Sequence, residues 1–112
     1  MNITGHGFRK LMRASEPFSY VLDVVPEPQE VFRFIQQHSG NTEREMYGDY
    51  NMGAGFALYL PKEEAPKVLE LVKIMGLPYE AIFAGSVEKS DERRVIIGPK
   101  DIQFTAKDLQ VR

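Results

Sequence analysis

The chain has 112 residues, of which 43% are apolar and 27% charged, and this composition is that of one ordinary globular domain over residues 1–112. Its net charge of -2 argues against nucleic-acid binding driven by overall charge. It lacks cysteine, any apolar run near the ~20 residues that cross a bilayer, and a recognisable signal peptide. We therefore expect a cytoplasmic protein with neither membrane nor nucleic-acid partners.

The first half of the chain is predicted to form three helices and two strands. Apolar residues at helical spacing indicate the first helix, and alternating apolar residues indicate the strands. Thr42 and Glu45 have the spacing of a capping box. On the helix between Pro28 and Gly40 we expect a buried stripe of Val31, Phe34, Ile35 and His38. The expected bounds are helix 7–14, strand 18–25, helix 28–40, helix 42–47 and strand 54–60.

The second half continues with a helix over residues 62–75, ended by Gly76. Strands are predicted over 79–87 and 93–97, and the polar segment between them indicates a hairpin. The alternation of Ile102 with Phe104, and of Leu109 with Val111, indicates a final extension or edge hairpin. The fold class that follows is α+β, with a mostly antiparallel or mixed sheet of at least four strands and helices packed on one face.

The first candidate site is the stretch Thr4-Gly5-His6-Gly7. Thr4 is a plausible helix N-cap, and the two glycines would leave backbone N–H groups open to an anion such as phosphate. At 100° per residue, four side chains share the side of the helix opposite its apolar residues. An alternative interpretation is a tight turn beside a solvated cationic face. The four side chains on that face are His6, Arg9, Lys10 and Arg13.

The second candidate site is the segment from Asn51 to Gly55, at the start of a predicted strand. Gly53 and Gly55 would point to the same face of that strand and allow a ligand to approach the backbone. Asn51 offers an amide that both donates and accepts hydrogen bonds. The alternative is close packing of a neighbouring helix. With two histidines and no cysteine we expect no metal site, and no residue is assigned a catalytic role.

In order and spacing, six stretches resemble the C-terminal domain of one family, the aminoimidazole ribonucleotide synthetases, also called phosphoribosylformylglycinamidine cyclo-ligases. The resemblance covers nearly the whole chain. The chain differs from most members of the family in having His6 between two glycines, where they have three consecutive glycines. The stretches are Asn2–Gly7, Glu45–Tyr47, Tyr50–Gly55, the helix from Lys62, and the segments Ala84–Val87 and Arg94–Ile97.

The resemblance implies an ATP-dependent closure of the imidazole ring of formylglycinamidine ribonucleotide, a step of purine biosynthesis. Family members are two-domain homodimers, in which the N-terminal domain supplies most contacts to ATP and magnesium. The substrate, which carries a phosphoribosyl group, binds between the domains. The segments matching residues 4–7 and 51–55 lie in or near that cleft, so the resemblance implies phosphate or substrate binding by Thr4, Gly5, His6, Gly7, Arg9, Arg13, Asn51, Gly53 and Gly55.

The ATP-binding half of the family is absent from these 112 residues. We therefore expect the chain to be inactive alone and to bind neither ATP nor magnesium without a partner domain, in cis or on a separate chain. Two alternatives stay open. The first is a module that binds a phosphorylated metabolite without catalysis. The second is an assembly domain in which Gly53 and Gly55 serve subunit packing.

Overall fold

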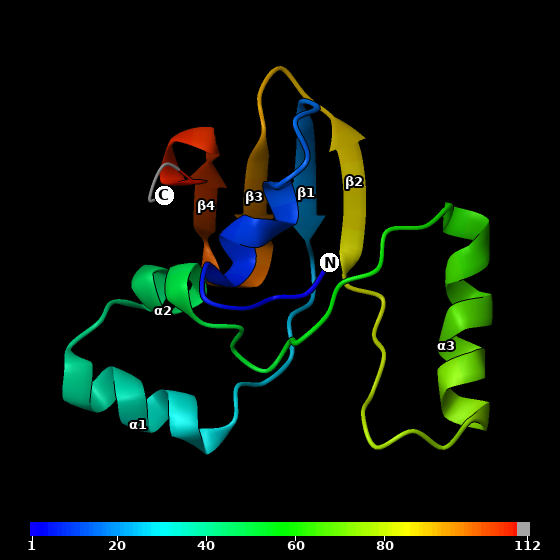
Figure 1. Ribbon diagram of the computed structural model, residues 1–112, viewed down its shortest axis with the longest axis horizontal. Helices are drawn as coiled ribbons and strands as arrows, with labels where there is room; N and C mark the ends of the chain where they lie inside the picture. The colour runs from blue at the N-terminus through cyan, green and yellow to red at the C-terminus, as the bar shows by residue number, and fades with distance from the viewer. Residues whose placement is uncertain (110–112) are drawn as a thin grey trace.

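A computed structural model describes residues 1–109 and shows a four-stranded sheet in the order β2-β1-β3-β4 (Figure 1). The central strand β1 is antiparallel to β2 and parallel to β3, and β3 is antiparallel to β4. The sheet is therefore mixed, which confirms the α+β class. The strands are β1 (Phe18–Leu22), β2 (Gly85–Lys89), β3 (Arg94–Ile97) and β4 (Ile102–Thr105).

The predicted hairpin between the strands at 79–87 and 93–97 is wrong, because β1 lies between β2 and β3. Tyr20 of β1 is in register with Val87 on one side and with Val95 on the other. β1 occupies the centre because its alternating apolar side chains are covered, whereas most of β2 is exposed, as in an edge strand. Residues 79–84 precede β2 without joining a strand ladder. The predicted final extension forms as β4, which pairs with β3 at the edge of the sheet, but Leu109 lies in a 3-10 turn and not in a strand, and Val111 lies outside the described residues.

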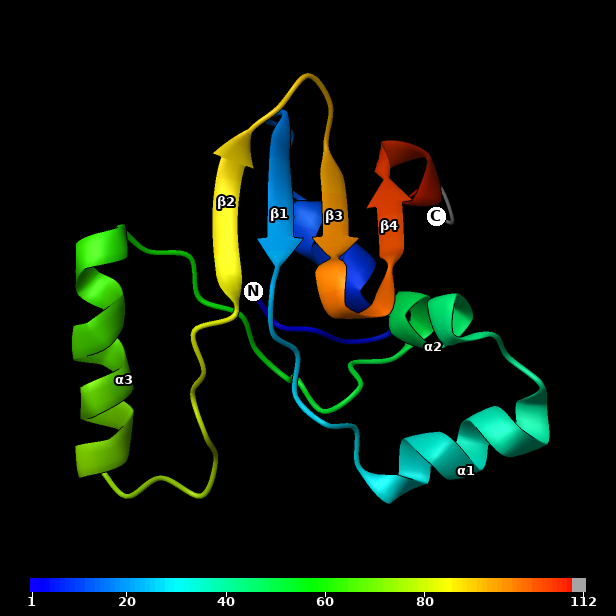
Figure 2. The same cartoon turned by 180° about the vertical axis from the view of Figure 1, so that it is seen from behind.

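The main core forms where a 3-10 helix, η1 (Gly7–Met12), crosses one face of the sheet (Figure 1). Figure 2 shows the opposite face without a helix over it. The short helix α2 (Glu43–Asp49) lies beside η1, and Phe8 meets Tyr47 edge-on at 5.2 Å between ring centroids. The core side chains are Ile3, Phe8, Leu11, Met12, Tyr20, Met46, Tyr47, Met52, Val95, Ile97, Ile102 and Phe104.

The capping box that precedes α2 is confirmed, with the side chains of Thr42 and Glu45 each bonded to the backbone of the other. Gly40 also ends α1 (Glu30–Ser39) as expected, in the left-handed conformation. The predicted buried stripe of α1 is wrong, because Val31, Phe34 and His38 are exposed. Ile35 is half-buried, and Phe32 packs against the core in place of the others. The helix touches the core along one narrow side, so its remaining apolar residues stay outside.

The predicted strand over residues 54–60 does not form. Instead of a strand ladder, it makes one isolated bridge with the first residues of the chain, between Asn2 and Phe56. Ile3 N–H donates to the Gly55 carbonyl at 3.0 Å, and Ala57 N–H donates to the Met1 carbonyl at 2.8 Å. A partner of three residues is too short to extend the ladder, and Phe56 remains 66% exposed.

The predicted helix over residues 62–75 is confirmed as η2 (Lys62–Glu64) followed by α3 (Ala65–Ile74), with Gly76 in a left-handed conformation. α3 stands to one side of the sheet in both views (Figures 1 and 2). The prediction that helices pack on one face of the sheet therefore holds for η1 but not for α1 or α3. Two further 3-10 turns, η3 (Gly98–Lys100) and η4 (Ala106–Leu109), flank β4. Within residues 1–109, no helix is long and apolar enough to span a bilayer.

Candidate functional site

The helix after the first glycine-rich stretch is a 3-10 helix, and this changes which of its side chains face inward. A 3-10 helix has 3.0 residues per turn, so residues three apart lie in one row along it. Arg9 therefore shares a row with Met12 and is only 9% exposed, while Lys10 and Arg13 share the outer row. The prediction that Arg9 belongs to an outward cationic face is therefore wrong, because it assumed the α-helical period of 3.6 residues per turn.

All three nitrogens of the Arg9 guanidinium donate hydrogen bonds within the protein. Its Nε donates to the Gly48 carbonyl at 2.7 Å and to the His6 carbonyl at 3.3 Å. One terminal nitrogen donates to the Asp108 carbonyl at 2.8 Å, and the other meets an Asp49 carboxylate oxygen at 3.1 Å. Arg9 thus ties η1 to the end of α2 and to η4. Arg9 therefore holds these segments in position and does not face solvent.

Gly7 is also a structural residue. Its φ is +52°, and its N–H donates to the Thr4 carbonyl at 2.7 Å. Contrary to the prediction, this amide is therefore not open to an anion. A β-carbon at Gly7 would meet the Tyr47 carbonyl oxygen and would lie 2.8 Å from the Tyr50 carbonyl oxygen. A glycine is required here because the backbone of η1 rests directly on the chain that leaves α2.

The outer side of the same turn is open. Gly5 is exposed, and nothing lies within 4 Å of the position that its β-carbon would take. Thr4 is not the N-cap, because His6 occupies that position and no side chain caps η1. The Thr4 hydroxyl instead accepts a hydrogen bond from Lys10 Nζ at 3.0 Å. Lys10 thereby brings a cation over the turn, and it was missing from the predicted binding residues although the helical wheel placed it on the cationic side.

Arg13 is not brought to this turn. It is the C-cap of η1, at the opposite end of the helix from His6, and its side chain is exposed. A helix of six residues spans about 12 Å at the 3-10 rise of ~2 Å per residue. So short a helix also has little macrodipole, and the attraction of an anion to a helix N-terminus has little weight here.

The second glycine-rich stretch forms a tight turn. Asn51 accepts the N–H of Ala54 at 2.9 Å through its carbonyl and the N–H of Gly53 at 3.0 Å through its side chain. Met52 and Gly53 both have positive φ, 49° and 95°, which is the pattern of a type I′ turn. Gly53 and Gly55 therefore do not share one face of a strand.

The two glycines of this turn have different surroundings. A β-carbon at Gly53 would lie 3.2 Å from the Gln29 side-chain oxygen and 3.5 Å from the Glu27 carbonyl, so Gly53 packs against its own chain. The neighbour is the segment leading into α1, not a helix. Gly55 has open space beside it, and its carbonyl accepts from Ile3.

Although they are far apart in sequence, the two predicted stretches lie together. Residues 1–3 run antiparallel to residues 55–57, and Gly7 rests on the backbone at Tyr50. The exposed turn at Thr4 and Gly5 therefore adjoins the segment that carries Gly55. Asp49 and Asp108, which hold Arg9 from two sides, complete the support and have no sequence motif that would have revealed them.

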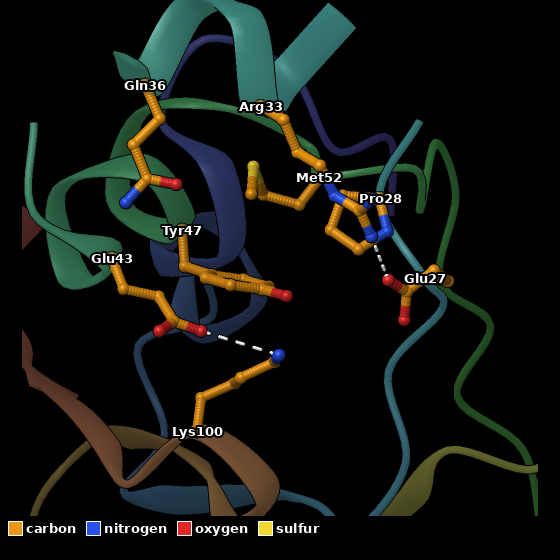
Figure 3. A pocket seen from close by; sticks show the side chains of 8 residues that line it. All are labelled: Glu27, Pro28, Arg33, Gln36, Glu43, Tyr47, Met52 and Lys100. Atoms are coloured by element: carbon orange, nitrogen blue, oxygen red, sulfur yellow. Dashed lines mark hydrogen bonds and ion pairs between the residues drawn. The ribbon is translucent and has the colours of Figure 1, made fainter. Parts of the chain in front are cut away.

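Within residues 1–109, no group of three histidines, aspartates or glutamates could hold a metal ion. A cavity of about 160 Å³ lies elsewhere, between α1, α2 and η3 (Figure 3). None of the nine predicted binding residues lines it, and it adjoins the second stretch only through Met52.

No family model matches the chain. Similar curated proteins each bear the name phosphoribosylformylglycinamidine cyclo-ligase. One from Methanococcus maripaludis (strain C6) is 37% identical over 91 residues, which is 81% of this chain and 26% of the relative. One from Methanocaldococcus jannaschii is 31% identical over 110 residues, 96% of this chain and 31% of the relative. One from Methanosarcina acetivorans is 42% identical over 77 residues, 67% of this chain and 23% of the relative.

Proposed function

Because this chain belongs to the phosphoribosylformylglycinamidine cyclo-ligase family, we propose that it is the substrate-side part of such an enzyme, inactive without an ATP-binding half. The chain spans only 26% and 31% of the two relatives first compared. The proposal places it as the C-terminal domain, with the ATP-binding domain joined in cis or supplied by another chain. The complete enzyme would be a homodimer of the cytoplasm.

The proposed reaction is a ring closure of purine biosynthesis. The formyl amide oxygen of formylglycinamidine ribonucleotide takes a phosphoryl group from ATP, and ADP leaves. An amidine nitrogen then attacks the activated carbon, the C–O bond to phosphate breaks, and aminoimidazole ribonucleotide forms. The residues of this chain would bind and orient the phosphoribosyl substrate. ATP and magnesium would be held by the other half, since the described residues offer no ligand cluster for the metal.

We assign the substrate phosphate to the outer side of the first turn. The N–H of Gly5, the Thr4 hydroxyl and the Lys10 ammonium are its closest candidates, with the Lys10–Thr4 hydrogen bond of 3.0 Å holding two of them together. An ammonium and a hydroxyl both donate to a phosphate oxygen. Gly7 and Arg9 would act beneath this turn by fixing its position. His6 would lie beside the phosphate, and Arg13 would act only through the wider positive field.

The adjoining turn would contact another part of the substrate. The Asn51 side-chain oxygen is already taken by Gly53, so its NH2 group is the part that would donate to a polar substrate atom. Gly53 would hold the turn against the segment before α1, and Gly55, whose carbonyl is bonded to Ile3, would leave open space beside its α-carbon. The observation that carries the proposal is this juxtaposition of the two glycine-rich stretches in a chain with cyclo-ligase relatives.

The test is a chimaera in which this chain replaces the matching segment of the Methanocaldococcus jannaschii relative. We expect release of ADP and formation of the aminoimidazole product, both dependent on formylglycinamidine ribonucleotide. The chain alone should give neither. A chimaera that folds and associates like the parent enzyme but closes no ring, while the parent does, would contradict the proposal.

A further inference from the structure

The cavity between α1, α2 and η3 is separate from the proposed phosphate turn and does not depend on the proposed function. The apolar part of its lining is made by Pro28, Met52 and the ring of Tyr47 (Figure 3). Its volume of about 160 Å³ is close to the ~150 Å³ of an engineered protein cavity that takes up benzene. The volume is therefore that of a single six-membered ring.

A polar group in the wall of the cavity lacks a hydrogen-bond partner. The side chain of Tyr47 is 1% exposed, and its hydroxyl makes no hydrogen bond to any part of the chain that the structure describes. In Figure 3 this hydroxyl points from the ring of Tyr47 into the space between the surrounding side chains. A buried hydroxyl without a partner destabilises the fold. A ligand atom that accepts its hydrogen would remove that destabilisation.

The hydroxyl is a donor at neutral pH. Burial raises the pKa of Tyr47, and the nearby carboxylates of Glu43 and Glu27 raise it further. The Tyr47 hydroxyl therefore stays protonated and can donate a hydrogen bond to an acceptor. The acceptor must come from a molecule small enough to enter the cavity.

The charges around the cavity balance one another. Lys100 Nζ lies 3.4 Å from a Glu43 carboxylate oxygen, and Arg33 is paired with Glu27 (Figure 3). Two cations and two carboxylates give no net charge. An anionic ligand would have to displace a carboxylate from its partner, and a cationic ligand would have to displace an ammonium or guanidinium. A neutral ligand leaves both pairs intact.

We propose that this cavity binds a small, uncharged ring that carries a carboxamide. The ring packs on Met52, Pro28 and Tyr47. The amide carbonyl accepts the Tyr47 hydroxyl hydrogen, and the amide NH2 donates to the Glu43 or Glu27 carboxylate. Each donor and acceptor of the ligand is thereby matched to a group already present in the wall.

The test uses benzamide as the probe and the methyl group of Met52 as the reporter, in the full chain labelled with 13C-methyl methionine. The Met52 resonance is assigned from a Met52→Leu sample. We expect benzamide to shift it saturably, with a dissociation constant of about 1 mM for so small a ligand. Benzoate, which has the same shape and a negative charge, should bind at least ~5-fold more weakly, since it must separate an ion pair.

The variant Tyr47→Phe removes the donor and keeps the ring. It should weaken benzamide binding by at least ~5-fold, the loss of about one hydrogen bond. Its urea midpoint should equal or exceed that of the unaltered chain, since an unpaired hydroxyl has gone. No Met52 shift up to 50 mM benzamide (on the order of 50 times the expected constant), equal affinity in Tyr47→Phe, or tighter binding of benzoate would each overturn the proposal. If Tyr47→Phe loses its fold, the comparison of benzamide with benzoate decides alone.

Discussion

Arg9 Nε donates to the carbonyl oxygen of Gly48 at 2.7 Å, across 39 positions of the sequence, and this bond joins η1 to α2. The same guanidinium reaches Asp49 and Asp108, so one buried cation binds three segments together. The first turn can hold its shape only while these segments stay in place.

Arg9→Met should lower the free energy of unfolding by about 3 kcal/mol, because it leaves three backbone carbonyls and one carboxylate without their donor. Urea unfolding monitored by circular dichroism measures the loss. Arg13→Met is the matched control, since Arg13 is exposed at the other end of η1, and it should change stability by no more than ~0.5 kcal/mol. Equal effects of the two substitutions would contradict the inward orientation of Arg9.

The two glycines of the first turn should respond differently to alanine. Gly7→Ala should destabilise the chain by at least ~3 kcal/mol, because a β-carbon would strike the backbone at Tyr47 and Tyr50 and φ is +52°. Gly5→Ala should stay within ~0.5 kcal/mol, since its side is open. Thermal unfolding of the two variants side by side makes the comparison. A Gly7→Ala variant as stable as Gly5→Ala would show that the two backbones do not approach this closely.

Asp108 should make stability depend on pH in the acidic range. Burial acts to raise the pKa of this carboxyl, but the hydrogen bonds from Thr105 N–H and the Arg44 guanidinium outweigh it and lower the pKa below 3.8. A group with a lowered folded-state pKa stabilises the fold above its unfolded pKa, and that stabilisation is lost as the pH falls through the folded value. The contribution should therefore be full at neutral pH and disappear progressively below about pH 4.

Urea midpoints measured between neutral pH and the acid limit of folding check this dependence. Asp108→Asn should be less stable at neutral pH and should lose less stability on acidification. A pH profile for Asp108→Asn parallel to that of the unaltered chain would contradict the assignment.

The sequence predicted most elements of this fold through local signals. Gly40 and Gly76 mark two helix ends, and Thr42 with Glu45 marks the start of α2, because each of these residues acts on its own neighbourhood. The order of the strands could not be predicted in this way. Whether β1 pairs with β2, β3 or both depends on contacts between distant segments, and the polar link over 88–92 is equally compatible with a hairpin or a crossing over β1.

The sequence indicated where the residues of the candidate site lie along the chain, but part of the predicted geometry was wrong. Both glycine-rich stretches were identified, and the structure places them side by side. Arg9 was assigned to the wrong side because an α-helical period was assumed where the chain forms a 3-10 helix. The close approach of Gly7 to Tyr50 joins segments far apart in sequence, and no local pattern encodes it. Lys10 is included in the candidate site because the structure shows its hydrogen bond to Thr4.

The most direct test of the central claim is the effect of Lys10→Met on the chimaeric enzyme described above, measured with formylglycinamidine ribonucleotide at saturating ATP. If Lys10 binds the substrate phosphate in both the ground state and the transition state, KM should rise about 10–100-fold with kcat little changed. Lys89→Met, at the exposed end of β2, is the matched control and should leave both constants unchanged. A KM for Lys10→Met equal to that of Lys89→Met would contradict the claim that the first turn holds the phosphate.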